Sequence, residues 1–372
     1  ALMIIILTQC YPPRIGGIEN LIFNLSISLS KYEKVLVLAD QHNLIKEIIF
    51  DKNYNNNLII KRFGGLRFFR KRNKYRELKK IIEIKKIKAI ITDSWKSIEY
   101  PISKINKKNY PIFTLVHGNE VIIKNKRHKE RIVNTLSKID KIICNSKFTE
   151  NLVHNIDVKL KNTEVIYPGV SNFDLIKAEK VEIKNGSPTL LTLARLEKRK
   201  GHEVILNVVK NLKKNYPEIR YIIAGEGNNL ANLKFISKKL GIDKNVIFLG
   251  PVNEEQKKYI FSITDILVMP TIDKSMEFSI EGFGIAYIEA ALFSIPSIAN
   301  NVGGTNEAVL HKQTGVIIQN INDLEKEMFN LLDNKNERIK LGDNARNRVM
   351  NELLWSNQIK KYISLISKYT SS

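Results

Sequence analysis

Residues 3–29 read MIIILTQCYPPRIGGIENLIFNLSISL, and this stretch decides the fold. It opens with the continuous apolar run Met3–Thr8, which is typical of a strand buried on both faces of a parallel sheet. After Gly16 and Gly17, apolar residues recur at helical spacing. The stretch therefore predicts a buried strand, a glycine-containing loop and a crossover helix, which together are the first unit of an α/β domain.

The same alternation of short apolar runs and longer amphipathic stretches continues along the chain and predicts two series of parallel strands. The first series is Met3–Thr8, Val35–Ala39, Leu58–Lys61, Ala89–Thr92, Ile112–Val116, Lys141–Cys144 and Thr163–Ile166. The second series is Thr189–Ala194, Tyr221–Ala224, Val246–Leu249, Ile266–Met269, Ser297–Ala299 and Gly315–Ile318. The fold class is therefore α/β, with two Rossmann-like doubly wound domains.

The two series are separated by a break at Tyr167-Pro168-Gly169-Val170, followed by a stretch of mixed charge that ends in turn-forming residues. We place the domain boundary there, with an N-terminal domain over 1–170 and a C-terminal domain over 171–351. A chain of 372 residues is long enough for two such cores. From Asn334 to Lys368 apolar residues return at helical spacing, which predicts a helical tail that could pack on either domain.

The composition is strongly basic, with 60 Lys and Arg against 38 Asp and Glu and a formal net charge of +22. An anionic partner is expected, although the abundance of Lys, Ile and Asn also fits a biased genomic base composition. The two cysteines, Cys10 and Cys144, form no Cys-x-x-Cys pair, which favours a reducing cytoplasm. The apolar run at 2–7 is too short for a membrane span or a secretory signal, so we expect no targeting segment.

Flexible or polar residues follow two strands of the first series, at the end where doubly wound sheets bind ligands. Gly16 and Gly17 let backbone amides at a helix start approach a phosphate or a sugar, or simply make a tight turn. No G-x-G-x-x-G occurs here, so a dinucleotide-dependent oxidoreductase is disfavoured. His117 follows the strand Ile112–Val116, where it can hydrogen-bond a reacting sugar or act as a structural histidine.

Two cations follow the first strand of the second series. Arg195 and Lys200 lie directly after Thr189–Ala194, where they can neutralise the diphosphate of a leaving nucleotide or form a solvated basic loop. No Asp-x-Asp occurs in the chain, so the carboxylate pair that often holds a divalent metal on a diphosphate is missing. We therefore expect no metal and no cofactor.

The most informative segment is Glu281-Gly282-Phe283-Gly284-Ile285-Ala286-Tyr287-Ile288-Glu289. Its glycines expose amides at a helix start, where they can meet phosphate oxygens. Glu281 and Glu289 are separated by about two helical turns, so both carboxylates can stand on one face and accept hydrogen bonds from a sugar and a ribose. The alternative is an amphipathic helix with two solvated acids.

In order and spacing, these motifs resemble the retaining family-4 glycosyltransferases with the GT-B fold, over nearly the whole chain. The resemblance is carried by Gly16-Gly17-Ile18-Glu19, His117-Gly118, Arg195 with Lys200, the Glu281 to Glu289 segment, and Val302-Gly303-Gly304-Thr305-Asn306-Glu307. The motifs look most like those of mannosyltransferases that use GDP-mannose on phosphatidylinositol mannosides. The resemblance implies two Rossmann-like domains facing across a cleft, with a C-terminal helix over about 352–372 crossing back to the first domain.

The resemblance also implies roles for individual residues. Its catalytic set is His117 near the transferred sugar, Arg195 and Lys200 at the diphosphate, and Glu281 at the sugar. Its donor-binding set is Gly16, Gly17, Val252, Gly282, Phe283, Gly284, Ile285 and Glu289. Within that set the Gly16 and Gly17 pair would meet the phosphates, Glu289 the ribose, and the backbone of Val252 the base.

The implied function is metal-independent, anomer-retaining transfer of a hexose, with mannose favoured, from a GDP- or UDP-linked sugar to a lipid-linked or cell-surface glycan acceptor. The route usually drawn for the family is front-face displacement, in which the leaving phosphate helps to deprotonate the acceptor. Two alternatives remain. A basic nucleic-acid-binding protein is disfavoured by the dispersed charge and the absence of a recognised module, and an inactive sugar-nucleotide-binding protein is disfavoured by the intact charged set.

A basic and aromatic stretch between Lys61 and Lys80 predicts docking to an anionic membrane surface, because cations can sit over headgroups while aromatic rings enter the interface. Its cations are Arg62, Arg67, Arg70, Lys71, Arg72, Lys74 and Arg76, and its aromatics are Phe63, Phe68, Phe69 and Tyr75. A second cluster from Lys124 to Arg131 either extends this surface or is a solvated helix face. We therefore expect a peripheral protein at the cytoplasmic face of a membrane, with no nucleic acid among its partners.

Overall fold

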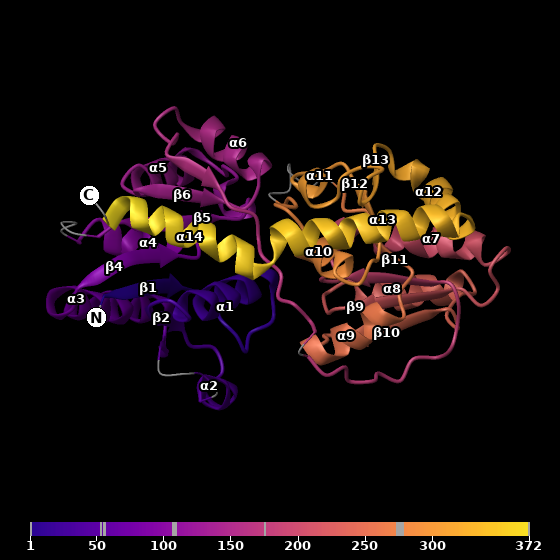
Figure 1. Cartoon of the computed structure of the whole chain (residues 1–372), viewed down its shortest axis with the longest axis horizontal. Helices are drawn as coiled ribbons and strands as arrows, with labels where there is room; N and C mark the ends of the chain where they lie inside the picture. The colour runs from indigo at the N-terminus through magenta and orange to yellow at the C-terminus, as the bar shows by residue number, and fades with distance from the viewer. Residues whose placement is uncertain are drawn as a thin grey trace. The chain divides into compact units, whose positions relative to one another are not determined.

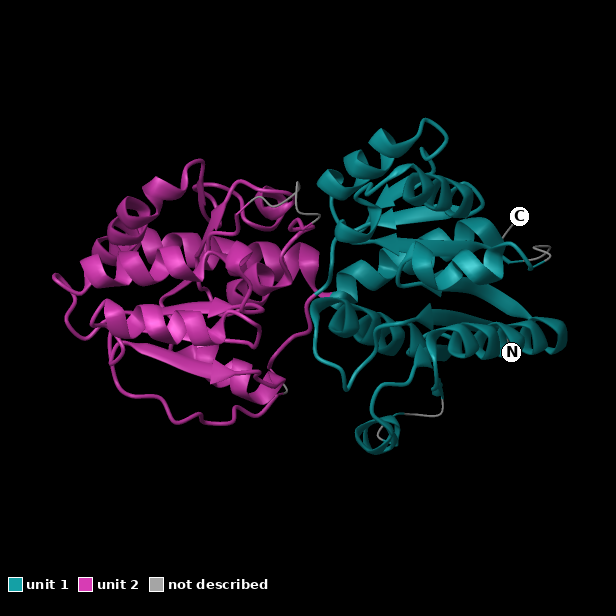
Figure 2. Ribbon diagram, turned by 180° about the vertical axis from the view of Figure 1, so that it is seen from behind, with its two compact units in different colours: residues 1–169, 355–372 teal, residues 170–354 magenta. Residues whose placement is uncertain are grey.

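The computed structural model describes residues 2–52, 54, 57–105, 110–174, 176–272 and 279–370. The chain divides into two compact units (Figure 2): unit 1 is residues 1–169 with 355–372, and unit 2 is residues 170–354. This division lies beside the boundaries expected at 170/171 and 351/352. It also places the last helix with the first domain.

Unit 1 is built on a seven-stranded parallel sheet in the order β3-β2-β1-β4-β5-β6-β7. Figure 1 labels β1, β2, β4, β5 and β6 of this sheet. Its strands are β1 Met3–Thr8, β2 Lys34–Asp40, β3 Leu58–Phe63, β4 Ile87–Thr92, β5 Ile112–Val116, β6 Lys141–Cys144 and β7 Thr163–Val165. Its helices are α1 Gly17–Ser30, α2 Leu44–Asp51, α3 Arg67–Ile84, α4 Trp95–Ile102, α5 Lys126–Leu136, α6 Lys147–Ile156 and α14 Trp355–Thr370. Strand β1 is buried along its whole length at the centre of the sheet, which explains its continuous apolar sequence.

Unit 2 is built on a six-stranded parallel sheet in the order β10-β9-β8-β11-β12-β13. Its strands are β8 Thr189–Leu193, β9 Arg220–Ala224, β10 Val246–Gly250, β11 Ile266–Met269, β12 Ser297–Asn300 and β13 Gly315–Ile318. Its helices are α7 His202–Leu212, α8 Leu230–Lys239, α9 Glu254–Ser262, α10 Ile285–Ala291, α11 Thr305–Ala308, α12 Leu324–Asp333 and α13 Lys335–Arg348. Each unit has its own cluster of buried apolar side chains.

Every strand expected from the sequence is present, and the largest differences are at two strand ends. Strand β3 continues to Phe63 instead of ending at Lys61, because β2 extends far enough to pair Asp40 with Phe63. Strand β4 begins at Ile87 instead of Ala89, because the first residue of β1 pairs with it. The α/β, doubly wound fold class is confirmed in both units.

The C-terminal tail is two helices, and the second of them, α14, lies within the helix expected over about 352–372. Helix α13 belongs to unit 2 and ends in the π-helical turn Val349–Leu353, after which α14 returns to unit 1. There α14 packs against α1, and the Tyr369 hydroxyl donates a hydrogen bond to the carbonyl oxygen of Asp140 at 3.0 Å. The crossing back of the tail, which the sequence resemblance implied, is therefore confirmed.

Candidate functional site

In each unit the chain winds away in opposite directions from two neighbouring central strands, and ligands of doubly wound sheets bind beyond the carboxyl ends of such strands. These strands are β1 and β4 in unit 1, and β8 and β11 in unit 2. The predicted site residues fall into two groups at these places. Gly16, Gly17 and His117 belong to unit 1, and the remaining nine belong to unit 2.

The central feature of unit 2 is a carboxylate held by two cations. Lys200 ends the short 3-10 helix η2 (Lys198–Lys200) after β8, and its Nζ contacts the Glu281 carboxylate in the segment after β11. The Arg199 guanidinium lies 3.5 Å from the same carboxylate oxygen, and all three side chains are largely buried. Burial by itself would raise the pKa of Glu281, but Lys200 and then Arg199 outweigh it and hold this pKa below its ordinary value.

The backbone of Glu281 is held by the glycine-rich segment that follows β12. The amide of Gly304 donates to the Glu281 carbonyl oxygen at 2.9 Å. Gly303 has a left-handed backbone with φ of +57° and lies against the same backbone, where a Cβ would collide. The glycines of the Val302 to Glu307 motif therefore hold the backbone that carries the Glu281 side chain.

Arg195 is placed differently from Lys200. Its side chain is 68% exposed, and its guanidinium contacts Glu197 at 3.0 Å. Glu197 also accepts a hydrogen bond from Arg199 Nε at 3.0 Å. The structure therefore brings Lys200 directly to Glu281, whereas Arg195 is linked to this cluster through Glu197 and Arg199.

A second buried ion pair lies on α10. The Glu289 carboxylate contacts Lys257 Nζ on α9 at 2.9 Å, and the same ammonium contacts Glu254 at 2.8 Å. Burial would lower the pKa of Lys257, but the carboxylates of Glu289 and then Glu254 outweigh it and raise this pKa. Glu289 is thus an oriented, charge-paired acceptor, with only 7% of its side chain exposed.

The start of α10 differs from the geometry expected from the sequence. The helix begins at Ile285, so Glu281 is not helical and does not share a helix face with Glu289. Phe283 is a buried side chain, so only its backbone can face a ligand. Gly284 has φ of +99° and lies against the ring of Tyr287, while Gly282 is buried and Ile285 is partly exposed. Val252 lies between β10 and α9, just before the α9 cap at Asn253.

In unit 1, His117 follows β5 and is held at both its backbone and its ring. Its amide donates to Glu120 Oε1 at 2.6 Å, and its Nε2 lies 2.8 Å from the Asp93 carbonyl oxygen. Because a carbonyl oxygen only accepts, Nε2 carries the hydrogen in this contact. The residue after it, Gly118, has φ of +123°.

The carboxylate of Asp93 fastens the ends of β1 and β4 together. It accepts hydrogen bonds from the Thr8 hydroxyl and the Gln9 amide, both at 2.8 Å, and from the Ser97 hydroxyl at 2.5 Å. Asp93 is 2% exposed, so this carboxylate is buried and held in one position by its hydrogen bonds. Through its own carbonyl oxygen it also holds the ring of His117.

The glycine pair lies at the start of α1. A Cβ on Gly16 would collide with the carboxylate of Glu19, a buried residue whose side chain contacts Arg14 at 3.0 Å. A Cβ on Gly17 would meet nothing within 4 Å. Gly16 therefore lies against the Glu19 carboxylate, whereas Gly17 borders open space.

Two family models match the chain. The model of Glycosyltransferase Family 4 covers residues 15–172, and the model of Glycosyl transferases group 1 covers residues 174–348. Between them they include every predicted site residue. The chain belongs to the GT-B glycosyltransferases.

Its relatives include proteins named for GDP-mannose. This glycosyltransferase is 26% identical over 176 residues to the GDP-mannose-dependent alpha-(1-6)-phosphatidylinositol monomannoside mannosyltransferase of Mycobacterium tuberculosis, a match covering 47% of the chain and 46% of that protein. The chain thus spans about half the length of that relative. It is 23% identical over 375 residues, 94% of each chain, to the GDP-mannose-dependent monoacylated alpha-(1-6)-phosphatidylinositol monomannoside mannosyltransferase of Corynebacterium glutamicum.

Solved structures share the fold at lower identity. HepE of Anabaena in complex with UDP-glucose matches with a TM-score of 0.79 and 16% identity, over 99% of this chain and 100% of that one. Sucrose-phosphate synthase of Thermosynechococcus elongatus matches with a TM-score of 0.80 and 18% identity, over 100% of both. These likenesses establish the two-domain architecture of the glycosyltransferase.

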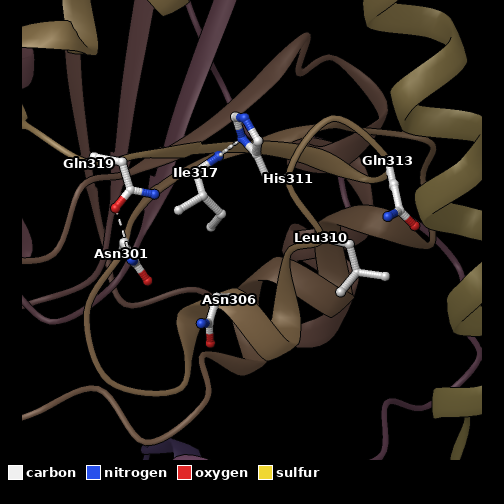
Figure 3. A pocket seen from close by; sticks show the side chains of 7 residues that line it. All are labelled: Asn301, Asn306, Leu310, His311, Gln313, Ile317 and Gln319. Atoms are coloured by element: carbon white, nitrogen blue, oxygen red, sulfur yellow. Dashed lines mark hydrogen bonds between the residues drawn. The ribbon is translucent and has the colours of Figure 1, made fainter.

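Unit 2 of the glycosyltransferase also has a cavity of about 340 Å³. Figure 3 shows the side chains that line it. It is lined by Asn301, Asn306, Leu310, His311, Gln313, Ile317 and Gln319. Two hydrogen bonds join residues of this lining: Asn301 donates to Gln319 at 2.9 Å, and His311 Nδ1 accepts from the Ile317 amide at 3.0 Å (Figure 3). None of the predicted site residues lines this cavity, so it is distinct from the charged cluster.

Three residues of the glycosyltransferase were not singled out as functional by their sequence. Arg199 is next to Lys200, and its burial beside Glu281 could have been suspected only from that proximity. Asp93 follows β4 directly, and residues at the carboxyl ends of such strands are expected to be functional. Lys257 has no sequence signal, because the contact with Glu289 joins two helices on separate crossovers.

In the part of the chain that the structure describes, no group of three or more His, Cys, Asp or Glu side chains is placed to hold a metal ion. Over the same residues, no helix is both long and apolar enough to cross a membrane.

Proposed function

We propose that this glycosyltransferase moves a hexose, with mannose favoured, from a GDP- or UDP-linked sugar to a lipid-linked or cell-surface glycan acceptor, with retention of the anomer. The observation that carries the proposal is the cluster of Glu281, Lys200 and Arg199 beyond β8 and β11. Two cations facing one buried carboxylate leave ammonium and guanidinium hydrogens for further acceptors. The phosphate oxygens of a nucleoside diphosphate are such acceptors.

In the proposed reaction the bond from the anomeric carbon to the diphosphate oxygen breaks, and the nucleoside diphosphate leaves with the electron pair. A bond from the acceptor oxygen to the anomeric carbon forms on the same face, and the acceptor proton passes to the leaving phosphate. Negative charge therefore grows on the diphosphate in the transition state. Lys200, with Arg195 and Arg199, would stabilise that charge, and Glu281 would hold Lys200 in place while accepting a hydroxyl of the sugar.

The remaining proposed contacts to the donor involve Glu289 on α10 and His117 in unit 1. Glu289 would accept hydrogen bonds from the ribose hydroxyls, since the contact with Lys257 orients its carboxylate. In unit 1, His117 would present Nδ1 to the transferred sugar, because its Nε2 is held by Asp93. We propose that no metal takes part, because the cations of η2 and the residues around it supply the charge that a divalent ion would otherwise provide.

The preference for mannose and for a lipid-linked acceptor is supported by the names of the two actinobacterial relatives. HepE was solved with UDP-glucose, so a UDP-linked donor stays within the proposal. The decisive experiment is a screen of GDP-, UDP- and ADP-linked sugars, reading thermal stabilisation and release of nucleoside diphosphate in the presence and absence of EDTA. NMR of the product then reads the anomer, and an inverted product or dependence on a metal would refute the corresponding part of the proposal.

We further propose that unit 1 docks on an anionic membrane through the first turns of α3. Arg67 is exposed there, beside Phe68 at 62% and Phe69 at 56% exposure. The basic surface is smaller than the sequence suggested, because Arg70 and Lys74 both contact Asp40 and the Arg62 side chain is only 5% exposed. Each exposed cation near an anionic surface contributes about 1 kcal/mol, so docking through α3 should be reversible and sensitive to salt.

Co-sedimentation with liposomes tests this docking. Binding should require anionic lipid and weaken as salt is raised, and Phe68→Ser with Phe69→Ser should weaken it further. Equal binding to neutral vesicles, or binding to neither kind, would favour a water-soluble acceptor instead.

A further inference from the structure

Helix α2 has the reverse of the usual amphipathic arrangement. Four aliphatic side chains at helical spacing face solvent, and we refer to them as the aliphatic stripe: Leu44 at 57%, Ile45 at 73%, Ile48 at 49% and Ile49 at 63% exposure. The charged residue Glu47 is instead 2% exposed. A surface helix normally turns its aliphatic residues inward, so this stripe marks a surface that is covered by something else.

The inward face of α2 is fixed by charge and by aromatic packing. Asp51 accepts two hydrogen bonds from Arg62 on β3, both at 2.7 Å, and Glu47 lies 3.4 Å from the same guanidinium. The ring of Phe50 packs against Phe23 with a centroid separation of 5.3 Å. The orientation of α2 is therefore specified by buried contacts, and the exposure of the stripe follows from it.

The same guanidinium joins α2 to the loop after β1. Arg62 donates to the carbonyl oxygen of Pro12 at 2.5 Å, and Pro12 lies in the loop that leads to Gly16 and Gly17. The His42 amide, just before α2, donates to Glu47 at 2.7 Å. Helix α2 is therefore a fixed part of unit 1, linked to the glycine loop through one buried arginine.

Charge decides which partner fits the stripe. Both acids of α2 are turned inward onto Arg62, so the outward charges of this segment are Lys46 within the helix and Lys52 at its end. An aliphatic surface flanked by cations matches the interface of an anionic bilayer. A second copy of this chain would bring the same lysines together on a protein of net charge +22, which disfavours a symmetric dimer.

A second exposed apolar group leaves the sheet at the same corner. Leu66 is 75% exposed just before α3, next to Phe68 and Phe69. The ends of β2 and β3, which lead toward α2 and α3, are joined by a hydrogen bond from the Gln41 amide to the Phe63 carbonyl oxygen at 2.8 Å. Both apolar groups therefore originate from one pair of neighbouring strand ends.

We infer that the aliphatic stripe of α2 inserts into the interface of an anionic membrane and anchors unit 1 hydrophobically. The inference rests on the proposed membrane docking and deepens it: α3 supplies a salt-sensitive attraction, and α2 supplies a contact that salt does not screen. Because α2 is joined to the Pro12 carbonyl through Arg62, insertion also holds the glycine loop at a set place relative to the membrane surface.

The test is vesicle binding by the Ile45→Ser/Ile48→Ser variant at low salt and at about 1 M salt, where the Debye length is about 3 Å. Vesicles contain phosphatidylglycerol with phosphatidylcholine, or phosphatidylcholine alone. The matched control is Ile84→Ser/Val158→Ser, which alters two aliphatic residues of unit 1 that are each 78% exposed away from α2. The α2 variant should bind anionic vesicles at least about tenfold more weakly at high salt, and the control should bind like the unaltered chain.

A second variant reports insertion directly. Tryptophan fluorescence of Ile48→Trp should shift to shorter wavelength with anionic vesicles, whereas that of Val158→Trp should not. An unshifted spectrum, or an α2 double variant that binds as well as the control, overturns the inference. So does loss of a dimer by light scattering in the α2 variant, because the stripe would then cover a second copy. Thermal stabilisation by GDP and UDP in the same variants reads the proposed donor site separately, and it should be unchanged.

Discussion

The carboxyl edges of the two sheets hold their loops in different ways. In unit 1 the buried carboxylate Asp93 accepts hydrogen bonds from neutral hydroxyl and amide groups. In unit 2 the buried carboxylate Glu281 is met by the cations Lys200 and Arg199. The carboxylates that follow the central strands thus meet neutral donors in unit 1 and cations in unit 2. In unit 1 the carboxylate paired with two cations is Asp40, which meets Arg70 and Lys74 at the end of β2.

This difference indicates how two similar sheets can take different tasks. A carboxylate whose oxygens are occupied by internal donors fixes geometry and offers nothing to a charged ligand. A carboxylate paired with two cations leaves donors that an anion can use. Our proposal places the diphosphate at the cluster of unit 2 because this cluster lies beyond the two central strands β8 and β11, whereas the Asp40 cluster of unit 1 lies at the end of β2. The imidazole of His117 and the backbone of Gly17 are then left for sugar and acceptor groups.

Among these substitutions, Lys200→Ala should have the largest effect, because it removes a cation from the cluster with Glu281. We expect kcat to fall by about 10²–10³-fold, because the contribution of Lys200 grows with the charge on the leaving diphosphate. Lys198→Ala, an exposed lysine of the same η2 turn, is the matched control and should retain turnover. Steady-state kinetics with the best donor from the screen measures both, and an unchanged kcat in Lys200→Ala would remove this residue from the site.

Arg195→Ala compares the exposed cation with the buried one. Arg195→Ala should also lower kcat more than it weakens acceptor binding. Its loss of kcat should be smaller than that of Lys200→Ala, because the Arg195 side chain is 68% exposed and more fully solvated. The measurement is the ratio of the two kcat losses under the same conditions. A larger loss for Arg195 would show that the internal ion pair of Lys200 with Glu281 diverts it from the diphosphate.

Acid should weaken unit 2 through His202, the residue that begins α7. Burial, helped by the charge of Lys200, lowers the pKa of His202 to about 4. The unfolded chain binds its proton near the ordinary histidine value, so stability is lost as pH falls from about 6.5 to about 4, by about 3 kcal/mol in total. His202→Gln should lack this loss, which calorimetry of both proteins across that pH range detects as a difference in the slope of Tm against pH.

Glu289→Gln should chiefly raise the donor KM, by about tenfold, with kcat nearly unchanged, because ribose contacts are made equally before and during the reaction. Glu254→Gln is its control, since it removes the other carboxylate partner of Lys257 and leaves Glu289 intact. A selective loss of kcat in Glu289→Gln would contradict the ribose role.

Gly17→Ala, in the loop after β1, should have the smallest effect on folding. A Cβ there meets nothing within 4 Å, so the free energy of unfolding should change by less than about 1 kcal/mol. A drop in turnover in this well-folded variant would then report that a ligand approaches the backbone at Gly17. Full activity would assign the glycine to local structure alone.

The sequence by itself determined the architecture. Strands such as β1 lie in the middle of parallel sheets, where both faces are buried, so their residues must be apolar without interruption and can be recognised locally. The positions of Lys200, Glu281 and His117 after strands were visible for the same reason, because chain order and strand direction place them at one edge of each sheet.

The tertiary structure decided which charges meet. Lys200 contacts Glu281 while Arg195 stays exposed, and nothing in the local sequence separates these two cations. Likewise the sequence predicted Arg62 as part of a basic surface, but its side chain is buried against Asp51, and this contact turns the aliphatic stripe of α2 outward. Ion pairs join residues on different crossovers, so their partners are set by the pairing of strands and the packing of helices, which no local pattern of residues contains.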